Sequence, residues 1–200
     1  HTGNWPGKTV VSARGQFKYN NNEYIMVDLP GSYSLFTASK DEEVTRDFLC
    51  YGNYDAVVVV ADATCIERNL NLVFQISKLT NKLILCINLI DEAKKKNIVI
   101  DKDGLQKELS IPIVLTSARS GYGMGELKNK IEKTSQNKSD EEEAESFLYF
   151  EQNAELREKI SEDNYNYANE LKQKYIREDI KKLNRDKKID DIVTSKKFGI

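Results

Sequence analysis

The chain has 200 residues, of which 40% are hydrophobic and 31% are charged, and its formal net charge is -2 at pH 7. This size suits one domain of ordinary length, or one domain with a small appendage. The near-neutral charge gives no electrostatic reason to expect nucleic acid or an anionic membrane as a partner. No apolar run approaches the ~20 residues that cross a bilayer, and a single histidine, His1, excludes a histidine-based catalytic triad.

The first quarter is predicted to hold a loop, two strands and a helix. Residues 1–7 are typical of a loop, and an Asn-rich turn joins strands expected over 10–19 and 23–27. After a polar stretch, residues 39–42 (Ser-Lys-Asp-Glu) have the spacing of a capping box. We expect the helix that begins there to stop near Gly52.

The middle of the chain alternates strands with helices. Residues 56–61 are continuously apolar, as a strand buried on both faces must be, and 83–87 and 111–115 repeat this character. Apolar residues at helical spacing predict three further helices, with faces at Leu70, Val73, Phe74 and Ser77, around Leu105 and Leu109, and at Leu127 and Ile131. The pattern predicts an α/β fold with a doubly wound, mainly parallel sheet.

The last third has a different character. Residues 134–140 are polar without a period, which indicates a domain boundary. No further strand is predicted beyond it, and apolar residues follow helical spacing at Ala168, Leu171, Tyr175, Ile176, Ile180 and Leu183, then at Ile189, Ile192 and Val193. We therefore expect a small all-α domain over 140–200 behind an α/β domain over 1–134. The three cysteines, Cys50, Cys65 and Cys86, are predicted to be reduced core residues of a cytosolic protein.

Three short motifs stand at predicted strand ends, where open α/β sheets bind ligands. Asp28-Leu29-Pro30-Gly31 offers a carboxylate for hydrated Mg²⁺ and a glycine N–H for a phosphate oxygen. In Asn88-Leu89-Ile90-Asp91, the amide and the carboxylate have the spacing to read a purine edge, and the carboxylate can accept from the N1–H and 2-amino group of guanine, which adenine lacks. In Thr116-Ser117-Ala118, a backbone N–H can meet the guanine carbonyl while Ser117 braces the loop. Singly, each motif also fits an ordinary turn, strand end or helix start, so the combination carries the specificity.

Together the motifs resemble the third, fourth and fifth guanine-nucleotide motifs of small GTPase domains. Longer strings resemble ferrous iron transport protein B of bacteria over nearly the whole chain. These strings are Gly3-Asn4-Trp5-Pro6-Gly7, Asp28 to Leu35, Asp62-Ala63-Thr64, Glu67-Arg68-Asn69-Leu70, Asp91-Glu92-Ala93, Lys188 to Val193 and Phe198-Gly199-Ile200. The resemblance implies a GTPase (G) domain of the P-loop type over 1–134, then a helical domain like a guanine-dissociation inhibitor over 140–200, which leads to a membrane part.

The resemblance also implies the roles of single residues. Gly7 and Thr9 match switch I, and the Thr9 hydroxyl would reach Mg²⁺. Asp28, Leu29, Pro30 and Gly31 match switch II: Asp28 would hold Mg²⁺ through water and the Gly31 N–H would bond the γ-phosphate. The guanine-binding positions are Asn88, Leu89, Asp91, Ser117 and Ala118. The implied cofactors are GTP or GDP, Mg²⁺ and, as a stimulator, K⁺, and no residue is assigned as catalytic.

One part of the family pattern is missing. The family begins with a strand, a phosphate-binding loop and a helix, and we expect this chain to lack all three. Residues 3–9 end in Gly-Lys-Thr but do not match, because only Asn4, Trp5 and Pro6 separate the glycines and no strand precedes them. The missing strand belongs in the middle of the sheet, so we expect two unpaired strand edges. The chain alone is predicted to bind GTP weakly, fold poorly, or both; a two-state melt with micromolar GTP affinity would contradict this.

The function implied is a GTP-binding and GTP-hydrolysing nucleotide switch of a ferrous iron transporter, on the cytoplasmic face of the bacterial inner membrane. Its partners would be guanine nucleotide and its own membrane domain. A homo-oligomer is compatible with this function, and nucleic acid is not expected as a partner. Ser32 stands where Ras-like proteins carry a water-orienting glutamine, which predicts slow intrinsic hydrolysis. The alternatives are a nucleotide-sensing module with incidental hydrolysis, a soluble GTPase of ribosome assembly or RNA modification, and specificity for adenine.

Overall fold

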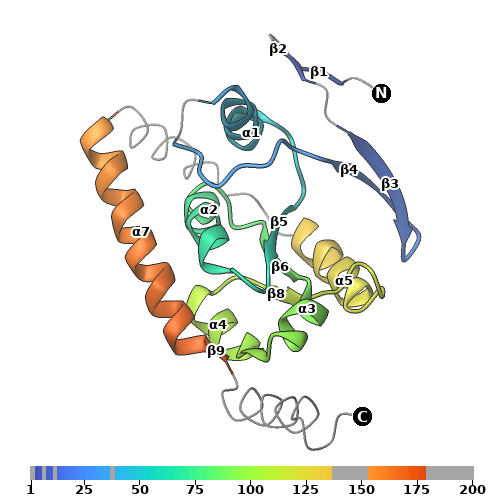
Figure 1. The fold of residues 1–200 in the computed structure, drawn as a ribbon. Coiled ribbons are helices and arrows are strands. Elements are labelled where there is room, and N and C mark those ends of the chain that lie inside the picture. Colours follow the sequence, from blue (N-terminus) through green and yellow to red (C-terminus); the bar gives the residue numbers. More distant parts are fainter. Residues whose placement is uncertain (1–2, 6–7, 11–12, 37–38, 137–152, 179–200) are drawn as a thin grey trace, which may run out of the picture.

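The computed structural model describes residues 3–5, 8–10, 13–36, 39–136 and 153–178 (Figure 1). In chain order the elements are β1 (Gly3–Trp5), β2 (Lys8–Val10), β3 (Arg14–Tyr19), β4 (Asn22–Val27), α1 (Lys40–Tyr51), β5 (Val57–Asp62), α2 (Glu67–Ser77), β6 (Leu83–Asn88), α3 (Ile90–Lys95), β7 (Ile98–Ile100), α4 (Lys102–Leu109), β8 (Ile113–Leu115), α5 (Met124–Ser135), α7 (Ala154–Tyr175) and β9 (Ile176–Glu178). The strands and helices alternate through the middle of the chain, which confirms the predicted α/β class.

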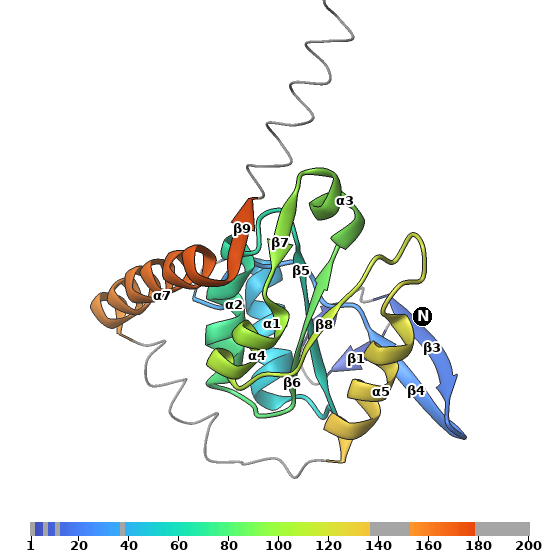
Figure 2. The ribbon, with the colours of Figure 1, turned by 90° about the horizontal axis from the view of Figure 1, so that it is seen from below.

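The centre of the molecule is a parallel sheet in the order β5-β6-β8. The register pairs Asp62 with Asn88 and Ile87 with Leu115, so the carboxyl ends of the three strands lie at one edge. Helices α1 and α2 lie on one side of this sheet and α5 on the other, while α7 runs along the outside of α2 (Figures 1 and 2). This arrangement confirms the doubly wound, mainly parallel sheet.

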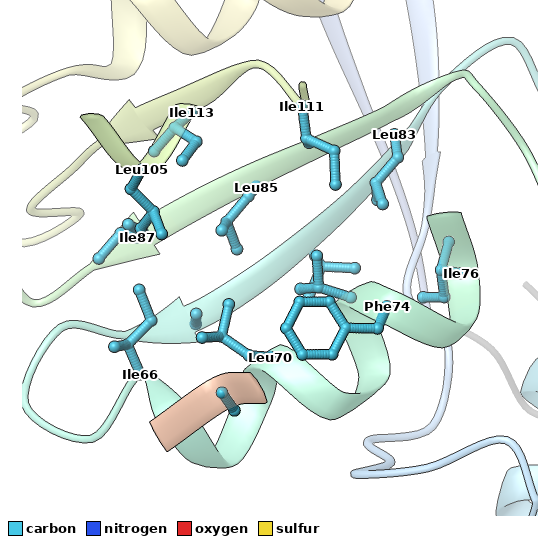
Figure 3. Close-up of a cluster of buried hydrophobic side chains, with 14 of the residues drawn as sticks. Ile66, Leu70, Phe74, Ile76, Leu83, Leu85, Ile87, Leu105, Ile111 and Ile113 are labelled. Atoms are coloured by element: carbon cyan, nitrogen blue, oxygen red, sulfur yellow. The ribbon is translucent and has the colours of Figure 1, made fainter. Parts of the chain in front are cut away.

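The hydrophobic core lies between the sheet and α2 (Figure 3). Residues 83–87 of β6 are all buried, because α2 covers one face of that strand and α5 contacts the other. Leu70 and Val73 of α2 are fully buried against the sheet, and Leu171 of α7 joins the same cluster. The apolar face of α2 differs from the prediction in one respect: Ser77 is exposed, whereas the polar Gln75 is completely buried.

The capping box predicted at residues 39–42 places the start of α1 correctly. The Ser39 side chain caps α1 by accepting from the Glu42 N–H, and the helix ends at Gly52 as predicted. Asp101 caps α4 in the same way, accepting from the Gly104 N–H. All three cysteines are free, as expected, although only Cys86 is buried.

The N-terminal prediction needs correction. The segment expected to be a loop contains β1, which pairs antiparallel with β2, and the strand expected over 10–19 is divided between β2 and β3. A Pro-Gly pair separates β1 from β2 in the sequence, and such a pair is a turn signal between two strands as well as a sign of a loop. The Asn-rich turn is confirmed, with Asn20 and Asn21 in the left-handed conformation that a two-residue hairpin requires.

Among the described strands, the hairpin β3–β4 and the central sheet are not paired with each other. The hairpin β3–β4 forms a sheet of its own, and β5 pairs only with β6. On the open side of β5, Val60 is 60% exposed, so the prediction that 56–61 are buried on both faces is wrong for this strand. Ile25 and Met26 of β4 are exposed as well. The outer edge of β5 is thus unpaired within the described residues.

The prediction of a C-terminal region without strands is also wrong. Residues 154–175 form the single helix α7, but Ile176 begins β9, which pairs antiparallel with β7. Because β9 has three residues and its partner lies far away in the sequence, its apolar residues could not be distinguished from the end of a helical pattern. The predicted helical positions Ile180, Leu183, Ile189, Ile192 and Val193, and most of the proposed boundary over 134–140, lie outside the described residues.

Candidate functional site

The second and third motifs meet at the carboxyl edge of the central sheet. Asn88 ends β6, and its side-chain Oδ1 accepts hydrogen bonds from the Thr116 hydroxyl at 3.2 Å and from the Ala118 N–H at 3.1 Å. The backbones are joined as well, since the Thr116 N–H donates to Ile87 O and the Ile90 N–H donates to Thr116 O. The two loops are thereby held as one unit.

The chain turns sharply between Asn88 and the helix that follows. Leu89 has φ of 63°, a left-handed conformation that costs free energy in a residue other than glycine. The turn lets α3 begin at Ile90 and places Asp91 in its first turn. A carboxylate there interacts favourably with the unpaired N–H groups of the helix start.

Asp91 and Ser117 present polar atoms that the protein itself does not satisfy. The neighbouring Ser117 hydroxyl, against the opposing effect of burial, lowers the pKa of Asp91, so this carboxylate is ionised at neutral pH. Nevertheless Asp91 Oδ1 and Ser117 Oγ are both buried without a hydrogen-bond partner. Because an unsatisfied buried polar atom is costly, the pair fits a ligand that brings hydrogen-bond donors.

The loop after β8 is held by hydrogen bonds within the protein. The Ala118 N–H donates to Asn88 Oδ1 and the Ser117 N–H donates to Tyr122 O, while Gly123 adopts φ of 76°. A side chain at Gly123 would collide with the carbonyl of Leu115, so this glycine lets the loop return against β8.

The first motif lies in the loop after β4 and has its own supports. The Asp28 N–H donates to Ala13 O at 2.9 Å, and Pro30 O accepts from the Thr45 hydroxyl of α1 at 3.0 Å. Asp28 and Gly31 are exposed, and the space around Gly31 is open, so both can be approached from solvent. These features fit the predicted contact with a phosphate and its Mg²⁺.

Two predicted positions can be described only in part or not at all. Thr9 lies in β2, where its backbone pairs with Asn4, and Gly7 lies outside the described residues.

Within the described part of the chain, no three His, Cys, Asp or Glu side chains gather into a metal-binding group. In the same ranges, no helix combines the length and apolar character needed to cross a bilayer.

Sequence reasoning missed a set of side chains behind the first motif. Gln75 of α2 is buried and binds the segment that follows Gly31, while Asn71 and Asn164 extend this contact to α7. The signal available in the sequence was a glutamine on an otherwise apolar helix face. In addition, Ser32 Oγ is buried without a partner.

Comparisons with known proteins agree with the arrangement of the motifs. A family model described as ferrous iron transport protein B matches residues 1–131. The Fe(2+) transporter FeoB of Campylobacter jejuni is 35% identical over 99% of this chain and 32% of its own length, and that of Escherichia coli K12 is 36% identical over 68% and 18%. The chain therefore spans about a third or less of the length of these relatives.

Solved structures show the same similarity. The cytosolic domain of the T. maritima FeoB iron transporter in a GDP form has a TM-score of 0.77 at 29% identity, with 88% of this chain and 89% of that one covered. The G domain of the same transporter is 44% identical over 68% of this chain and 83% of that one, with a TM-score of 0.62. On the family match and the relatives' identity, this chain belongs to the ferrous iron transport protein B family.

Proposed function

We propose that the chain contributes the guanine-reading half of a GTP-binding site. The observation that carries this proposal is the pair of unsatisfied atoms, Asp91 Oδ1 and Ser117 Oγ, beside the Asn88–Ala118 contact. Asp91 would accept from the N1–H and the 2-amino group of guanine, and adenine would leave its carboxylate without donors. Asn88 acts by holding the two loops in position. A solved relative crystallised in GDP and GMPPNP forms supports the choice of ligand.

The first motif would serve the phosphate end of the nucleotide. Asp28 would hold Mg²⁺ through water, the Gly31 N–H would donate to the γ-phosphate, and Thr9 would join the metal in the triphosphate state. Bound Mg²⁺ would neutralise charge on the β- and γ-phosphates. Stimulation of hydrolysis by K⁺ is proposed from the family resemblance.

The biological role we propose is a GTP-hydrolysing switch that regulates ferrous iron uptake. The chain would lie on the cytoplasmic face of the bacterial inner membrane and act on a membrane domain of the same protein, with a homo-oligomer as one assembly. Support comes from the relatives, which are Fe(2+) transporters of greater length. In such a switch, loss of the γ-phosphate releases the loops that it had ordered.

The nucleotide assignment is tested with Asp91→Asn in the full-length protein. The amide presents a donor where guanine also presents donors, so we expect preference to move from guanosine to xanthosine nucleotides. Binding is measured with fluorescent analogues of both, and Asp103→Asn on α4 is the control because it is exposed. Equal loss of both nucleotides in Asp91→Asn, or an unchanged preference, would refute the proposed guanine contact.

Hydrolysis and regulation need separate measurements. Ser32→Ala should hydrolyse GTP at nearly the wild-type rate, because a serine at this position is too short to orient the attacking water as a glutamine does. A large loss of rate would overturn that reading. Iron uptake is then measured with a variant that binds GTP but does not hydrolyse it. Uptake should change if hydrolysis drives the switch, and it should be unchanged if the protein is a nucleotide sensor with incidental hydrolysis.

A further inference from the structure

The Thr116 hydroxyl lies between two side chains of β6, those of Cys86 and Asn88. The two residues are two positions apart in the strand, so they share one face of the sheet. The register pairs Cys86 with Val114, and Thr116, two residues further along the chain, therefore comes opposite Asn88. Thr116 Oγ1 lies 3.2 Å from Cys86 Sγ and 3.2 Å from Asn88 Oδ1.

The direction of both hydrogen bonds follows from a backbone group. The Ala118 N–H can only donate, and it donates to Asn88 Oδ1 at 3.1 Å, which fixes this amide with its oxygen toward the loop. The Thr116 hydroxyl therefore donates its single proton to the same oxygen. With that proton used, Thr116 Oγ1 offers only lone pairs to Cys86, so the thiol is the donor in the contact between them.

The thiol end of this arrangement is closed to water, and the amide end is not. Cys86 is 3% exposed and Thr116 is 1% exposed, whereas Asn88 is half-buried. Burial raises the pKa of the Cys86 thiol, so the sulfur keeps its proton at neutral pH. A donor that is lost at Cys86 has no ready substitute in solvent, while the amide end can be reached by a ligand.

The bond from the thiol has consequences for the loop after β8. A hydroxyl that accepts one hydrogen bond is polarised and becomes a better donor in the next, so the thiol strengthens the bond from Thr116 to Asn88. Ser117 follows Thr116 directly, is 2% exposed, and carries the Oγ without a partner. A change in how Thr116 is held would therefore move the very residue whose side chain lacks a partner.

We propose that Cys86 is a positioning residue of the guanine-reading site around Asp91 and Ser117. Its thiol donates to Thr116 and keeps the Thr116 proton on Asn88, which holds the two loops of the site together. The proposal rests on the proposed function for the identity of the ligand. Cys86 acts only through Thr116, and because an S–H group is a weak donor, its loss should weaken nucleotide binding severalfold rather than abolish it.

The first measurement is the S–H stretching band in the Raman spectrum of the full-length protein. The band of Cys86 is isolated by subtracting, in each background, the spectrum of Cys86→Ser, which has no S–H group at this position. Donation weakens the S–H bond, so removing the acceptor with Thr116→Val should move the band to higher wavenumber. Thr80→Val, at another buried threonine, is the matched control and should leave the band in place. A band that does not move in Thr116→Val would overturn the proposal.

The second measurement is the affinity of the same protein for a fluorescent GDP analogue. Cys86→Val removes the donor but keeps a small apolar side chain, and the affinity should fall about two- to fivefold. Cys86→Ser keeps a donor and should bind like wild type. In the Thr116→Val background the acceptor is absent, so Cys86→Val should cause no further loss.

Two results of the binding measurement would contradict the positioning role. Equal losses from Cys86→Val in the wild-type and Thr116→Val backgrounds would show that Cys86 acts through packing alone. Cys86→Ser binding as weakly as Cys86→Val would show that the donor is irrelevant.

The two measurements separate this inference from the proposed function. If the wild-type protein binds no guanosine nucleotide, the proposed function is refuted, while the Raman shift still decides whether the thiol donates to Thr116. If wild type binds the nucleotide and Cys86→Val binds it equally well, the positioning role is overturned and the function stands.

Discussion

Three glycines, two in the loop before α5 and one in its first turn, offer a graded test of how the loop that carries Ser117 is built. Gly121 and Gly123 both have positive φ, of 75° and 76°, but only Gly123 faces an obstacle, the carbonyl of Leu115. Gly125 lies in the first turn of α5 with open space around it. Alanine therefore adds the same methyl group at three positions that differ in backbone conformation and in the space available.

The expected changes in the free energy of unfolding follow from these situations. Alanine at Gly125 should stabilise by about 0.5 to 1 kcal/mol, because it restricts the unfolded chain and suits a helix. At Gly121 the left-handed conformation costs an L-residue about 1 to 2 kcal/mol, partly offset by the same entropic gain, which leaves a net loss of about 1 kcal/mol. Gly123 adds a clash with backbone that cannot move aside, for a total of about 2 to 4 kcal/mol.

Urea unfolding followed by far-ultraviolet circular dichroism measures the three variants against wild type. The order of stability should be Gly125→Ala, then wild type, then Gly121→Ala, then Gly123→Ala. Equal losses for Gly121→Ala and Gly123→Ala would refute the reasoning, because they would show that the contact with Leu115 O imposes no constraint. Nucleotide binding should fall most in Gly123→Ala, since its loop carries Ser117.

Three further predictions concern the core, a helix cap and acid stability. Leu70→Ala should cost about 2 to 5 kcal/mol in thermal or urea unfolding, because this side chain is fully buried in the core. Ser39→Ala should cost about 1 kcal/mol by leaving the Glu42 N–H without its cap. Lys174 donates to Glu108 and lowers the pKa of this carboxyl group. The contact therefore stabilises the fold above the usual carboxyl pKa, and this stabilisation is lost as the pH falls. The difference in the free energy of unfolding between wild type and Glu108→Gln should accordingly vanish in acid.

Each of these has an outcome that would contradict it. A loss below 1 kcal/mol for Leu70→Ala would mean that the site collapses around the missing atoms, and Tyr165→Ala at an exposed position is the comparison. For Ser39→Ala, an unchanged midpoint would show that solvent replaces the cap. For Glu108→Gln, a difference that persists below the usual carboxyl pKa would show that the loss does not come from ionisation.

The parts of the fold that the sequence predicted well depend on short-range signals. The cap at Ser39, the stop at Gly52 and the fully apolar strand 83–87 were all expected in these positions. Each is decided within a few residues: a cap by one side chain and one N–H, a buried strand by a run of apolar residues. The same holds for the three motifs, whose residues were found at the ends of β4, β6 and β8.

The failures concern contacts between segments far apart in the chain. Nothing in the three residues of β9 indicates that they pair with β7, and the exposure of Val60 depends on what lies beside β5 rather than on its own sequence. Likewise, nothing in the sequence around Gln75 indicates its partners, Leu35 and Asn71, because the contact with Leu35 joins two segments 40 residues apart.

By itself, the sequence determined the chemistry available at the site: a carboxylate, an amide and small residues, each placed after an apolar run. Tertiary structure alone decided how these groups are used. In the folded chain the Ala118 N–H donates to Asn88, while Asp91 Oδ1 and Ser117 Oγ have no partner. Residues 33–36 contact α7 through the bond from Arg157 to Phe36 O. The physical reason is that a hydrogen bond is decided by distance and direction, which the residues of one segment do not specify for another.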